Sequence, residues 1–430
     1  MLSVKRTLCL WMVGMNLYCT FTGEKFSEKD EKPPQIEVLS LKDVLQAIEL
    51  YGLKFQAARF EVSAQAGDLR QTTLYPNPRL EMSREDFGSS SPEGPKVVYQ
   101  LEQPIPWPRL RAKRREVEEN RLEAAKIQNE IARLKFTSET IRIFYELLGA
   151  QEEVKLELEN LTLVKSLVET VSARFQAGKV SEAEIAKSRI LLASAQLDIK
   201  RAITKKENIR RNLATLMGQV RPSFEGVVGD LESIHPPPSL EKLEKSLSHT
   251  PELKKWQWMK LEKENQLHVL KMERKPQLSL LLGTTHFESE GQEGYELGVG
   301  WELPLFDRKQ GLIARQNAEL SRANALYEQT HLELHQALAA KFLITEVSFQ
   351  TAVTLKKQVL PDARIALART RASYQLGREG YMELLEAQRT WVQTRKQYIS
   401  ALVDYHRAHS ELYRLLGKNV HATEEWHHED

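Results

Sequence analysis

Cysteine is almost absent from this chain: among 430 residues only Cys9 and Cys19 occur, both within the first 23 residues. Without that segment, neither a disulfide nor a cysteine metal site is expected. The net charge is small, because 61 basic residues balance 59 acidic ones, which argues against bulk nucleic-acid binding. Beyond the N-terminus no run of about 18 apolar residues predicts a transmembrane helix. Signatures of phosphate loops, nucleophile elbows and zinc proteases are missing, so we expect neither catalysis nor a cofactor.

The N-terminus has the composition of an export signal. Lys5 and Arg6 precede a short apolar stretch, residues 7–19, which is too short to span a bilayer. Residues 1–23 are therefore predicted as a cleaved signal peptide and residues 24–38 as a linker. Cys19 leaves lipidation as an alternative, although its preceding residues depart from a lipidation motif. A buried cytosolic helix fits less well, because a charged, proline-containing spacer follows.

The chain contains one long internal repeat. Residues 174–179 (RFQAGK) return as residues 373–378 (SYQLGR), an offset of 199 residues given by 377 minus 178. A repeat of this length is too long for a solenoid unit and indicates duplication of a whole helix–hairpin–helix module. We predict a first repeat at 39–219, a linker at 220–238, a second repeat at 239–418 and a His- and acid-rich tail at 419–430.

Each repeat contains two segments in which apolar and polar residues alternate. After a predicted helix at 39–74, one strand begins near Leu80 and its partner covers residues 97–102; the equivalent segments are 278–283 and 295–303. One face is apolar and aromatic, and the other is small or acidic. Segments of about 9–11 residues with this alternation are typical of membrane β-barrels. A half-buried soluble hairpin is the alternative.

Four strands are too few for a barrel, because an open edge is not tolerated in lipid and barrels begin at about eight strands. Three copies would supply twelve strands, enough for a water-filled lumen, so the pattern favours a homotrimer. Glu102 and Glu302 lie on the predicted lumen face and would form a ring of six carboxylates that favours cations. The alternative is that these positions only need to be polar.

Long helices occupy the rest of each repeat. Residues 109–177 contain no helix breaker except Gly149, and residues 360–374 repeat the apolar pattern of their last part. Pro361 should kink or restart the second of these helices. The spacing of three and four residues predicts a coiled-coil seam, formed in the first copy by Leu161, Val164, Val168, Val171 and Phe175.

Two glycines, Gly178 and Gly377, permit tight reversals, after which new helices are expected near Ser181 and Gly380. The predicted fold class is therefore mainly α with a small β part. A non-membrane coiled-coil scaffold would share these helices, but it leaves the alternating strands and the export signal unexplained.

Several short motifs occur in a familiar order: residues 75–78 (YPNP), Gln103 with Pro104, residues 303–306 (LPLF), and an aromatic residue before each reversal glycine. Together they resemble the outer-membrane efflux protein family, the TolC-like channels, over about residues 39–417. The resemblance implies a trimer in which a twelve-stranded outer-membrane β-barrel continues as a tunnel of long antiparallel helices across the periplasm. Such a channel opens when it is docked to a periplasmic adaptor and an inner-membrane RND-type pump.

The segments around Pro104, Pro106 and Pro304 at the junction of barrel and helices resemble the metal-ion efflux branch typified by CzcC. Residues 107–110 (WPRL) depart from the Gly-Gly-Lys-Arg that is usual there. This resemblance implies an exit duct for divalent heavy-metal cations. The alternative cargo is that of a multidrug or type I secretion channel.

The resemblance also places the helix reversals at the periplasmic mouth, where they would meet the adaptor. Opposite charges near the reversals could hold the mouth closed, although an exposed ion pair contributes only about 0–1 kcal/mol. A solvated turn is the alternative. The residues predicted for docking and gating are Gly178, Lys179, Ser181, Glu182, Gly377, Arg378, Glu379 and Gly380.

All 11 histidines follow Gly229. His331 and His335 are one helical turn apart, as are His406 and His409, but a structural role is favoured for both pairs over metal binding. The tail histidines His421, His427 and His428 lie among acidic residues and form a weak candidate for loose metal chelation, with a disordered end as the favoured alternative.

Overall fold

A computed structural model of the chain describes residues 38–85, 94–288 and 290–418. The predicted signal peptide, Cys19 and the tail histidines His421, His427 and His428 lie outside the described residues. All elements below belong to one unit, residues 36–430.

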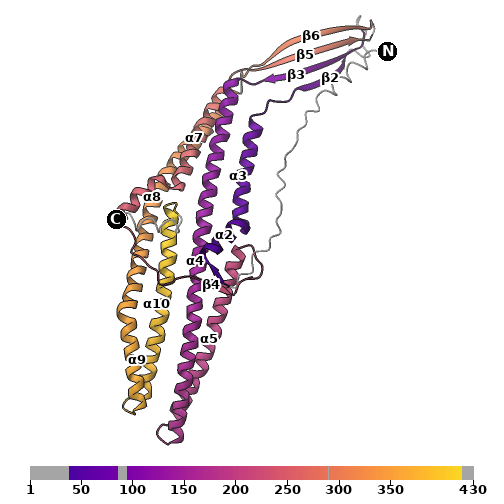
Figure 1. Cartoon of the computed structure of the whole chain (residues 1–430). Coiled ribbons are helices and arrows are strands. Elements are labelled where there is room, and N and C mark those ends of the chain that lie inside the picture. The colour runs from indigo at the N-terminus through magenta and orange to yellow at the C-terminus, as the bar shows by residue number, and fades with distance from the viewer. Residues whose placement is uncertain (1–37, 86–93, 289, 419–430) are drawn as a thin grey trace. The chain divides into compact units, whose positions relative to one another are not determined.

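The same order of elements occurs twice along the chain (Figure 1). The first run is β1 (Val38–Ser40), α2 (Leu41–Tyr51), α3 (Leu53–Thr72), β2 (Arg79–Glu85), β3 (Lys96–Ile105), α4 (Pro108–Gln176) and α5 (Glu182–Leu216). The second run is β4 (Gly226–Val228), α6 (Leu240–Ser246), the 3-10 turn η1 (Leu247–His249), α7 (Pro251–Met272), β5 (Gln277–Phe287), β6 (Gln292–Glu302), α8 (Gln310–Thr354), the π turn η2 (Leu355–Val359), α9 (Leu360–Gln375) and α10 (Tyr381–Leu415). The predicted fold class, mainly α with a small β part, is confirmed.

None of the helices within the described ranges combines the length and the apolar character that a membrane-crossing helix requires.

The prediction of one helix over 39–74 is wrong in two places. Residue 39 belongs to β1, because Ser40 caps α2: its hydroxyl accepts from the Asp43 amide at 3.3 Å, and the Asp43 carboxylate accepts from the Ser40 amide at 3.0 Å. The helix then stops at Gly52, whose ψ of 114° is extended. A Cβ at Gly52 would lie 2.4 Å from the Ile48 carbonyl oxygen, so this bend requires glycine.

The predicted linker 220–238 contains a strand that belongs to the core. β4 pairs in parallel with β1, from Val38 opposite Gly226 to Ser40 opposite Val228. Gln151 of α4 completes the pairing of β4, because its amide donates to the Val227 carbonyl at 2.8 Å and accepts from the Val227 amide at 2.9 Å. The side chain of Val227 is buried in the largest apolar cluster, together with residues of α2, α4, α5 and α10.

Four strands form one antiparallel sheet in the order β2-β3-β5-β6 (Figure 1). Since directly paired residues share a face of a sheet, the register assigns every residue to one of two faces. Leu80 pairs with Leu101, Leu101 with Leu282, and Leu282 with Leu297. These leucines define an apolar face, and the alternate residues define a polar face. The predicted strands are confirmed, although β5 and β6 extend further than their apolar alternation showed.

The long helix predicted over 109–177 is confirmed as α4, 69 residues or about 100 Å. α4 packs on α3, α5, α7 and α10. Val164 and Val171 are fully buried on the predicted seam, but Phe175 is 39% exposed, so its placement on the seam is wrong. At Gly149 the backbone of α4 lies against α10, because a Cβ there would be 2.4 Å from the Val403 side chain.

The second long helix is interrupted where Pro361 predicts a kink. Residues Leu355–Val359 form a π turn, in which the Leu360 amide donates to the Leu355 carbonyl, and α9 restarts with Pro361 in its first turn. Proline has no amide hydrogen and its ring crowds the carbonyl four residues earlier. The π turn accommodates both effects, and α4 has no such interruption.

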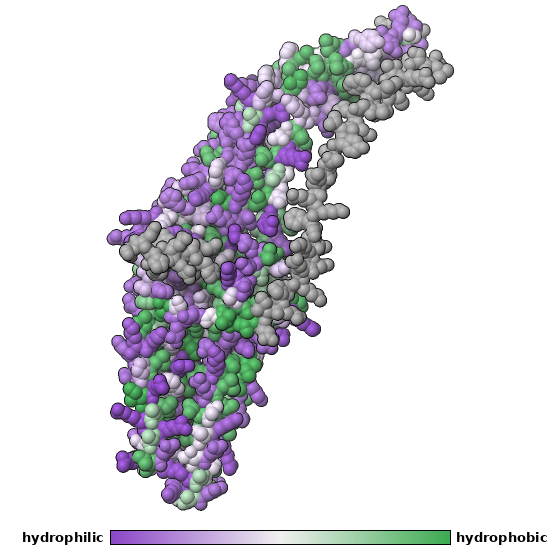
Figure 2. Space-filling model, viewed as in Figure 1, coloured by the Kyte–Doolittle hydropathy of each residue, from purple (hydrophilic) through white to green (hydrophobic). Residues whose placement is uncertain are grey.

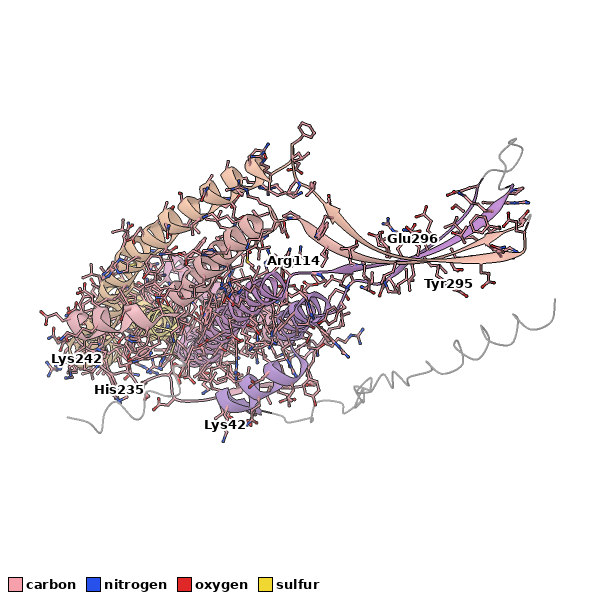
Figure 3. All side chains as sticks on the ribbon, turned by 90° about the horizontal axis from the view of Figure 1, so that it is seen from above. Lys42, Arg114, His235, Lys242, Tyr295 and Glu296 are labelled. Atoms are coloured by element: carbon pink, nitrogen blue, oxygen red, sulfur yellow. The ribbon has the colours of Figure 1, made fainter. Side chains whose placement is uncertain are left out.

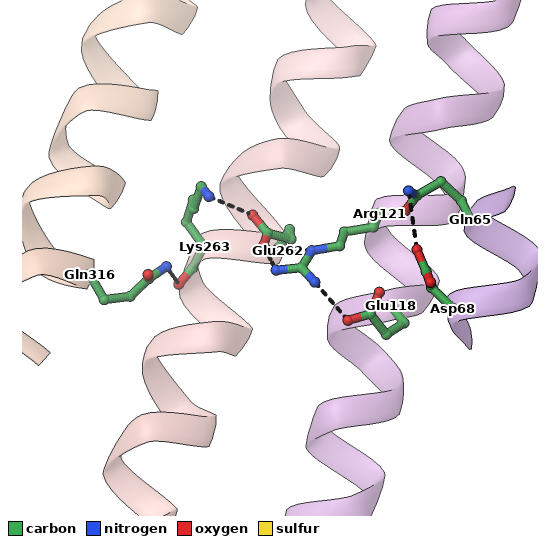
Figure 4. Close-up of polar contacts among 7 residues, drawn as sticks. All are labelled: Gln65, Asp68, Glu118, Arg121, Glu262, Lys263 and Gln316. Carbon is green, nitrogen blue, oxygen red and sulfur yellow. Dashed lines mark hydrogen bonds and ion pairs between the residues drawn. The ribbon is translucent and has the colours of Figure 1, made fainter. Parts of the chain in front are cut away.

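A polar network fixes α4 against α7 and α8 (Figure 4). Arg121 donates to Glu262 Oε1 at 2.9 and 3.0 Å and to Glu118 at 2.7 Å. The Glu262 side chain is 7% exposed and also contacts Lys263 Nζ at 3.2 Å. Gln316 of α8 donates to the Lys263 carbonyl at 2.9 Å. A buried carboxylate is costly without partners, so this pairing selects one register of the three helices.

Candidate functional site

The polar face of the sheet carries an excess of acid. Figure 3 shows Tyr295 and Glu296, neighbours in β6, projecting from opposite faces of the sheet. Both predicted lumen residues, Glu102 and Glu302, lie on the same face as Glu296, as the register shows. The charged residues of this face are Arg79, Glu81, Glu85, Lys96, Glu102, Glu296 and Glu302. Five acids and two bases give a net charge of −3 per chain.

Glu102 and Glu302 do not occupy one row of the sheet. Glu102 is opposite Leu281 of β5, whereas Glu302 is opposite Gln277, four residues away along the same strand. At about 3.3 Å per residue, this separation is roughly 13 Å along the strand. Glu102 and Glu302 therefore lie in different rows of the sheet, because the strand register does not follow the repeat offset. The acidic residues of this face are spread over several rows of the sheet.

Sequence reasoning did not select Glu81, Glu85 and Glu296 as candidate site residues, although they share the face of Glu102 and Glu302. The alternation of polar and apolar residues was enough to place them on that face, because the side-chain period of a strand is two. Acidity is thus a property of the whole face, not of two special residues.

The opposite face is apolar and exposed. Leu80 is 71% exposed, Leu297 75% and Tyr295 83%. Figure 2 shows hydrophobic residues gathered over the part of the sheet nearest the helices. A contiguous exposed apolar surface indicates a contact with lipid or with another protein.

At the junction of strands and helices, Pro104 lies near the end of β3, Pro106 between β3 and α4, and Pro304 after β6. Trp107 donates from its indole nitrogen to the Pro276 carbonyl at 2.9 Å, which ties the start of α4 to the segment before β5. The three prolines therefore mark the ends of strands, as predicted.

Both reversals close with the same backbone motif. Gly178 and Gly377 have φ of 69° and 73°, the left-handed region that favours glycine. The Lys179 amide donates to the Arg174 carbonyl at 2.9 Å, and the Arg378 amide donates to the Ser373 carbonyl at 3.0 Å. These are Schellman motifs, which satisfy carbonyls at a helix end. α5 and α10 begin at Glu182 and Tyr381, close to the predicted starts.

A small apolar core joins the two hairpin ends. It contains Val171 of α4, Ile185 of α5, Tyr374 of α9, and Tyr381 and Leu384 of α10, all buried. Burial, followed by the neighbouring Tyr374 and Glu184, raises the pKa of Tyr381 to about 12, so this phenol stays neutral.

Polar contacts between the hairpins surround this core. Arg174 of α4 lies over the Tyr374 ring, 4.7 Å from its centroid, and donates to the Tyr374 carbonyl at 3.2 Å. Arg371 donates to Ser166 Oγ at 3.2 Å, across the same interface. Arg174 occupies the seam position where Phe175 was expected. The ends of the two hairpins are thus joined by an arginine from each: Arg174 of α4 and Arg371 of α9.

The predicted ion pairs of the mouth are not formed within one chain: among the described residues, Lys179, Glu182, Arg378 and Glu379 pair neither with one another nor with any other charged residue. Ser181 caps α5, accepting from the Glu184 amide at 3.4 Å. The equivalent residue Gly380 has no side chain for this role, and the start of α10 lacks a side-chain cap. The two tips therefore present different surfaces.

The buried histidine supports a structural role. His406 stacks on Tyr145 with ring centroids 3.7 Å apart and contacts the Leu231 carbonyl at 2.9 Å. Burial lowers the pKa of His406 to about 4, so the ring is neutral at pH 7. The rings of His331 and His335 are 4.7 Å apart. Over residues 38–85, 94–288 and 290–418, no group of three or more potential ligands could hold a metal ion.

Comparison with known proteins places this geometry in a family. The profile of the family "Outer membrane efflux protein" matches residues 49–219 and 243–418. The cobalt-zinc-cadmium resistance protein CzcC of Cupriavidus metallidurans is 28% identical over 381 residues, 88% of this chain and 90% of that protein. The nickel-cobalt-cadmium resistance protein NccC of Alcaligenes xylosoxydans xylosoxydans is 24% identical over 76% of this chain and 72% of that protein.

Solved structures share the fold. A crystal structure of CusC, described in connection with transmembrane channel formation, superposes with a TM-score of 0.77 at 15% identity. The match covers 92% of this chain and 96% of that one. The CmeC outer membrane channel of Campylobacter jejuni superposes with a TM-score of 0.74 at 16% identity, over 90% of this chain and 88% of that one.

Proposed function

Because the chain belongs to the outer membrane efflux protein family, it is an efflux channel of the outer membrane that extends into the periplasm, and we propose that its cargo is a divalent transition-metal cation. The observation that supports the cargo proposal is the acid-rich polar face of the sheet, whose opposite face is apolar and exposed. The names of CzcC and NccC, which state resistance to cobalt, zinc, nickel and cadmium, point to the same class of cargo.

A homotrimer follows from the two free edges of the sheet. β2 and β6 are its edge strands, and in lipid each edge must find a partner, because unpaired backbone groups cost several kcal/mol there. Pairing β2 of one chain with β6 of the next closes a ring. Three chains give twelve strands, which leaves an aqueous lumen, whereas two give eight, which side chains fill.

The charge of the polar face favours cations. At −3 per chain, three chains would place nine net negative charges around the lumen, at several levels along the strands. Rings of acidic side chains concentrate cations and exclude anions, and an apolar drug gains little from them. A multidrug or type I secretion channel is the alternative within the same fold, and a non-membrane scaffold is the alternative of another class.

The cargo is tested by deleting the gene and measuring growth. We expect lower tolerance to zinc, cobalt, nickel or cadmium and near-normal tolerance to dyes and antibiotics. The reverse pattern would overturn the metal proposal and leave the channel intact. Recovery of the chain as a soluble monomer would overturn both.

A finer test removes charge from the sheet. E102Q with E302Q changes the polar face from −3 to −1 per chain, and cation selectivity in planar bilayers should fall. The matched control is E61Q with E328Q, which removes two exposed acids from α3 and α8. Equal selectivity in both variants would mean that Glu102 and Glu302 only supply polarity.

The hairpin tips are the proposed docking surface for the periplasmic adaptor, which in turn joins an inner-membrane RND-type pump. The chain has no cysteine after residue 23, so K179C or R378C introduces the one thiol of that part of the chain at one tip. Each should cross-link to the adaptor in cells, while a control thiol at exposed Lys42 should not. Equal cross-linking at all three positions would contradict the assignment.

A further inference from the structure

The segments that join the sheet to the helices carry concentrated positive charge. Residues 106–115, 273–275 and 303–315 contain ten basic and two acidic residues, a net charge of +8. The whole chain has a net charge of only +2, so the remainder is negative. We call these three segments the basic collar.

The three segments meet in space. Arg114 of α4 forms an ion pair with Glu273 at 2.7 Å, which joins the first segment to the second. The pairing of β5 with β6 starts at Gln277 opposite Glu302 and places the second segment beside the start of the third. Figure 3 shows Arg114 at the end of the helices where the strands begin. The charge therefore forms one surface next to the sheet.

Half of the basic residues are available to an outside partner. Some are paired within the chain, as Lys113 is with Glu116 and Arg115 with Glu119. Five others are exposed and form no ion pair in the part of the chain that the structure describes: Arg109, Arg274, Lys275, Arg308 and Arg315.

The basic collar adjoins exposed apolar residues. Trp301 is 64% exposed on the apolar face, and Ile105, Trp107, Leu303 and Leu305 are each at least 42% exposed. Along the chain, each of these residues lies two to seven positions from the nearest free cation, Arg109 or Arg308. A bilayer changes from hydrocarbon to head groups over about 5–8 Å on each side, and Trp with Lys or Arg is enriched at that boundary.

We propose that the basic collar binds the phosphate groups of anionic phospholipids, of the phosphatidylglycerol type, in the leaflet on the helix side of the membrane. The proposal rests on the proposed membrane function, because the sheet must lie in lipid. The argument depends on the order of the groups. The apolar face matches the hydrocarbon, the tryptophans match the interface, and the five free cations match the charged head groups. A lumen-facing collar would instead repel the cations that the acidic face admits. Each cation near an anionic surface strengthens binding by about five-fold, which salt weakens.

The test measures which lipid surrounds the full chain. The protein is reconstituted in phosphatidylcholine vesicles that contain either brominated phosphatidylglycerol or brominated phosphatidylcholine, and quenching of tryptophan fluorescence reports the lipids next to Trp107 and Trp301. We expect stronger quenching by the brominated phosphatidylglycerol, reduced by high salt. In R274Q with K275Q the preference should fall several-fold. The control R189Q with K200Q removes two exposed charges from α5 and should keep it.

The outcomes separate the two proposals. Absence of quenching by either brominated lipid would mean that the chain does not enter the bilayer, which would overturn the membrane function as well. Equal quenching by both lipids in the wild type, or an unchanged preference in R274Q with K275Q, would overturn the basic collar alone. A change of ion selectivity in that variant without any lipid preference would place the collar in the lumen and also refute it.

Discussion

The contact of Gly149 with α10 gives the sharpest test of the helical packing. An added Cβ would lie 2.4 Å from Val403 Cγ2 and 3.6 Å from Ile399 Cγ2. Ordinary carbon contacts are about 3.5–4.0 Å, so G149A creates an overlap of at least about 1 Å. Valine in a helix has one strongly preferred rotamer and cannot turn away cheaply. Overpacking of this kind costs roughly 1–3 kcal/mol.

The helix propensity of alanine opposes this cost by about 0.8–1 kcal/mol. G149A should therefore destabilise the chain by up to about 2 kcal/mol. In G149A with V403A the overlapping methyl group is gone while the propensity gain remains, so the double variant should be more stable than G149A. The coupling energy expected from residues in contact is about 0.5–3 kcal/mol.

The assay is thermal unfolding of the purified chain in detergent, followed by circular dichroism at fixed pH. Gly67 of α3 supplies the matched control, because a Cβ there would meet nothing within 4 Å. G67A should raise the midpoint, G149A should lower it, and V403A should restore it. If G149A raises the midpoint as G67A does, or if V403A adds a second, independent loss, the close approach of α4 and α10 is refuted.

Three further predictions concern the tips and the core. R174Q removes a charge-assisted hydrogen bond worth about 1.5–3 kcal/mol and a cation–π contact worth about 0.5–1 kcal/mol. Because this contact of Arg174 with Tyr374 holds the two hairpin ends together at the proposed mouth, single-channel conductance should rise, and unchanged conductance would mean that the contact does not restrict the mouth. G178V and G377V place a β-branched residue in the left-handed region at about 1–3 kcal/mol each and should impair efflux with the chain still in the membrane, so normal efflux in both would reject the role of the reversals. Burial lowers the pKa of His406 from 6.5 to about 4, so the unfolded chain binds more protons than the folded chain between those pH values. The contribution of His406 to the free energy of unfolding should therefore be complete above pH 6.5 and fall by roughly 3 kcal/mol as the pH drops toward 4. H406F keeps the stacking but not the titration, so its melting midpoint should depend less on pH, and an equal dependence would contradict the assignment.

Local signals made most of the architecture predictable. The reversals at Gly178 and Gly377 follow from glycine after a long apolar period, and the strands follow from alternation, both of which act within a few residues. Pro361 marked the interruption of its helix for the same reason. Such features depend on neighbouring residues in the sequence, so a single sequence is enough to predict them.

The missed features depend on distant partners. β4 has only three residues, and its partner β1 is 188 positions away, as 226 minus 38 shows, so no local pattern reveals it. The break at Gly52 was hidden because the apolar period continues on both sides. Glu102 and Glu302 are equivalent in the repeat, but strand register is fixed across the sheet and places them in different rows. Arg174 replaced Phe175 on the seam because its guanidinium finds the Tyr374 ring and carbonyl, which lie on another hairpin.

The π turn Leu355–Val359 makes the duplicated halves mechanically unequal. α4 runs without interruption, whereas its counterpart is divided into α8 and α9, and a helix bends most readily at such a turn. In the proposed trimer, six hairpins would surround the tunnel, and three stiff ones would alternate with three that bend more readily. Any widening at the hairpin ends would then move every second hairpin, with three-fold and not six-fold symmetry. Pro361 of each chain would determine which hairpins move.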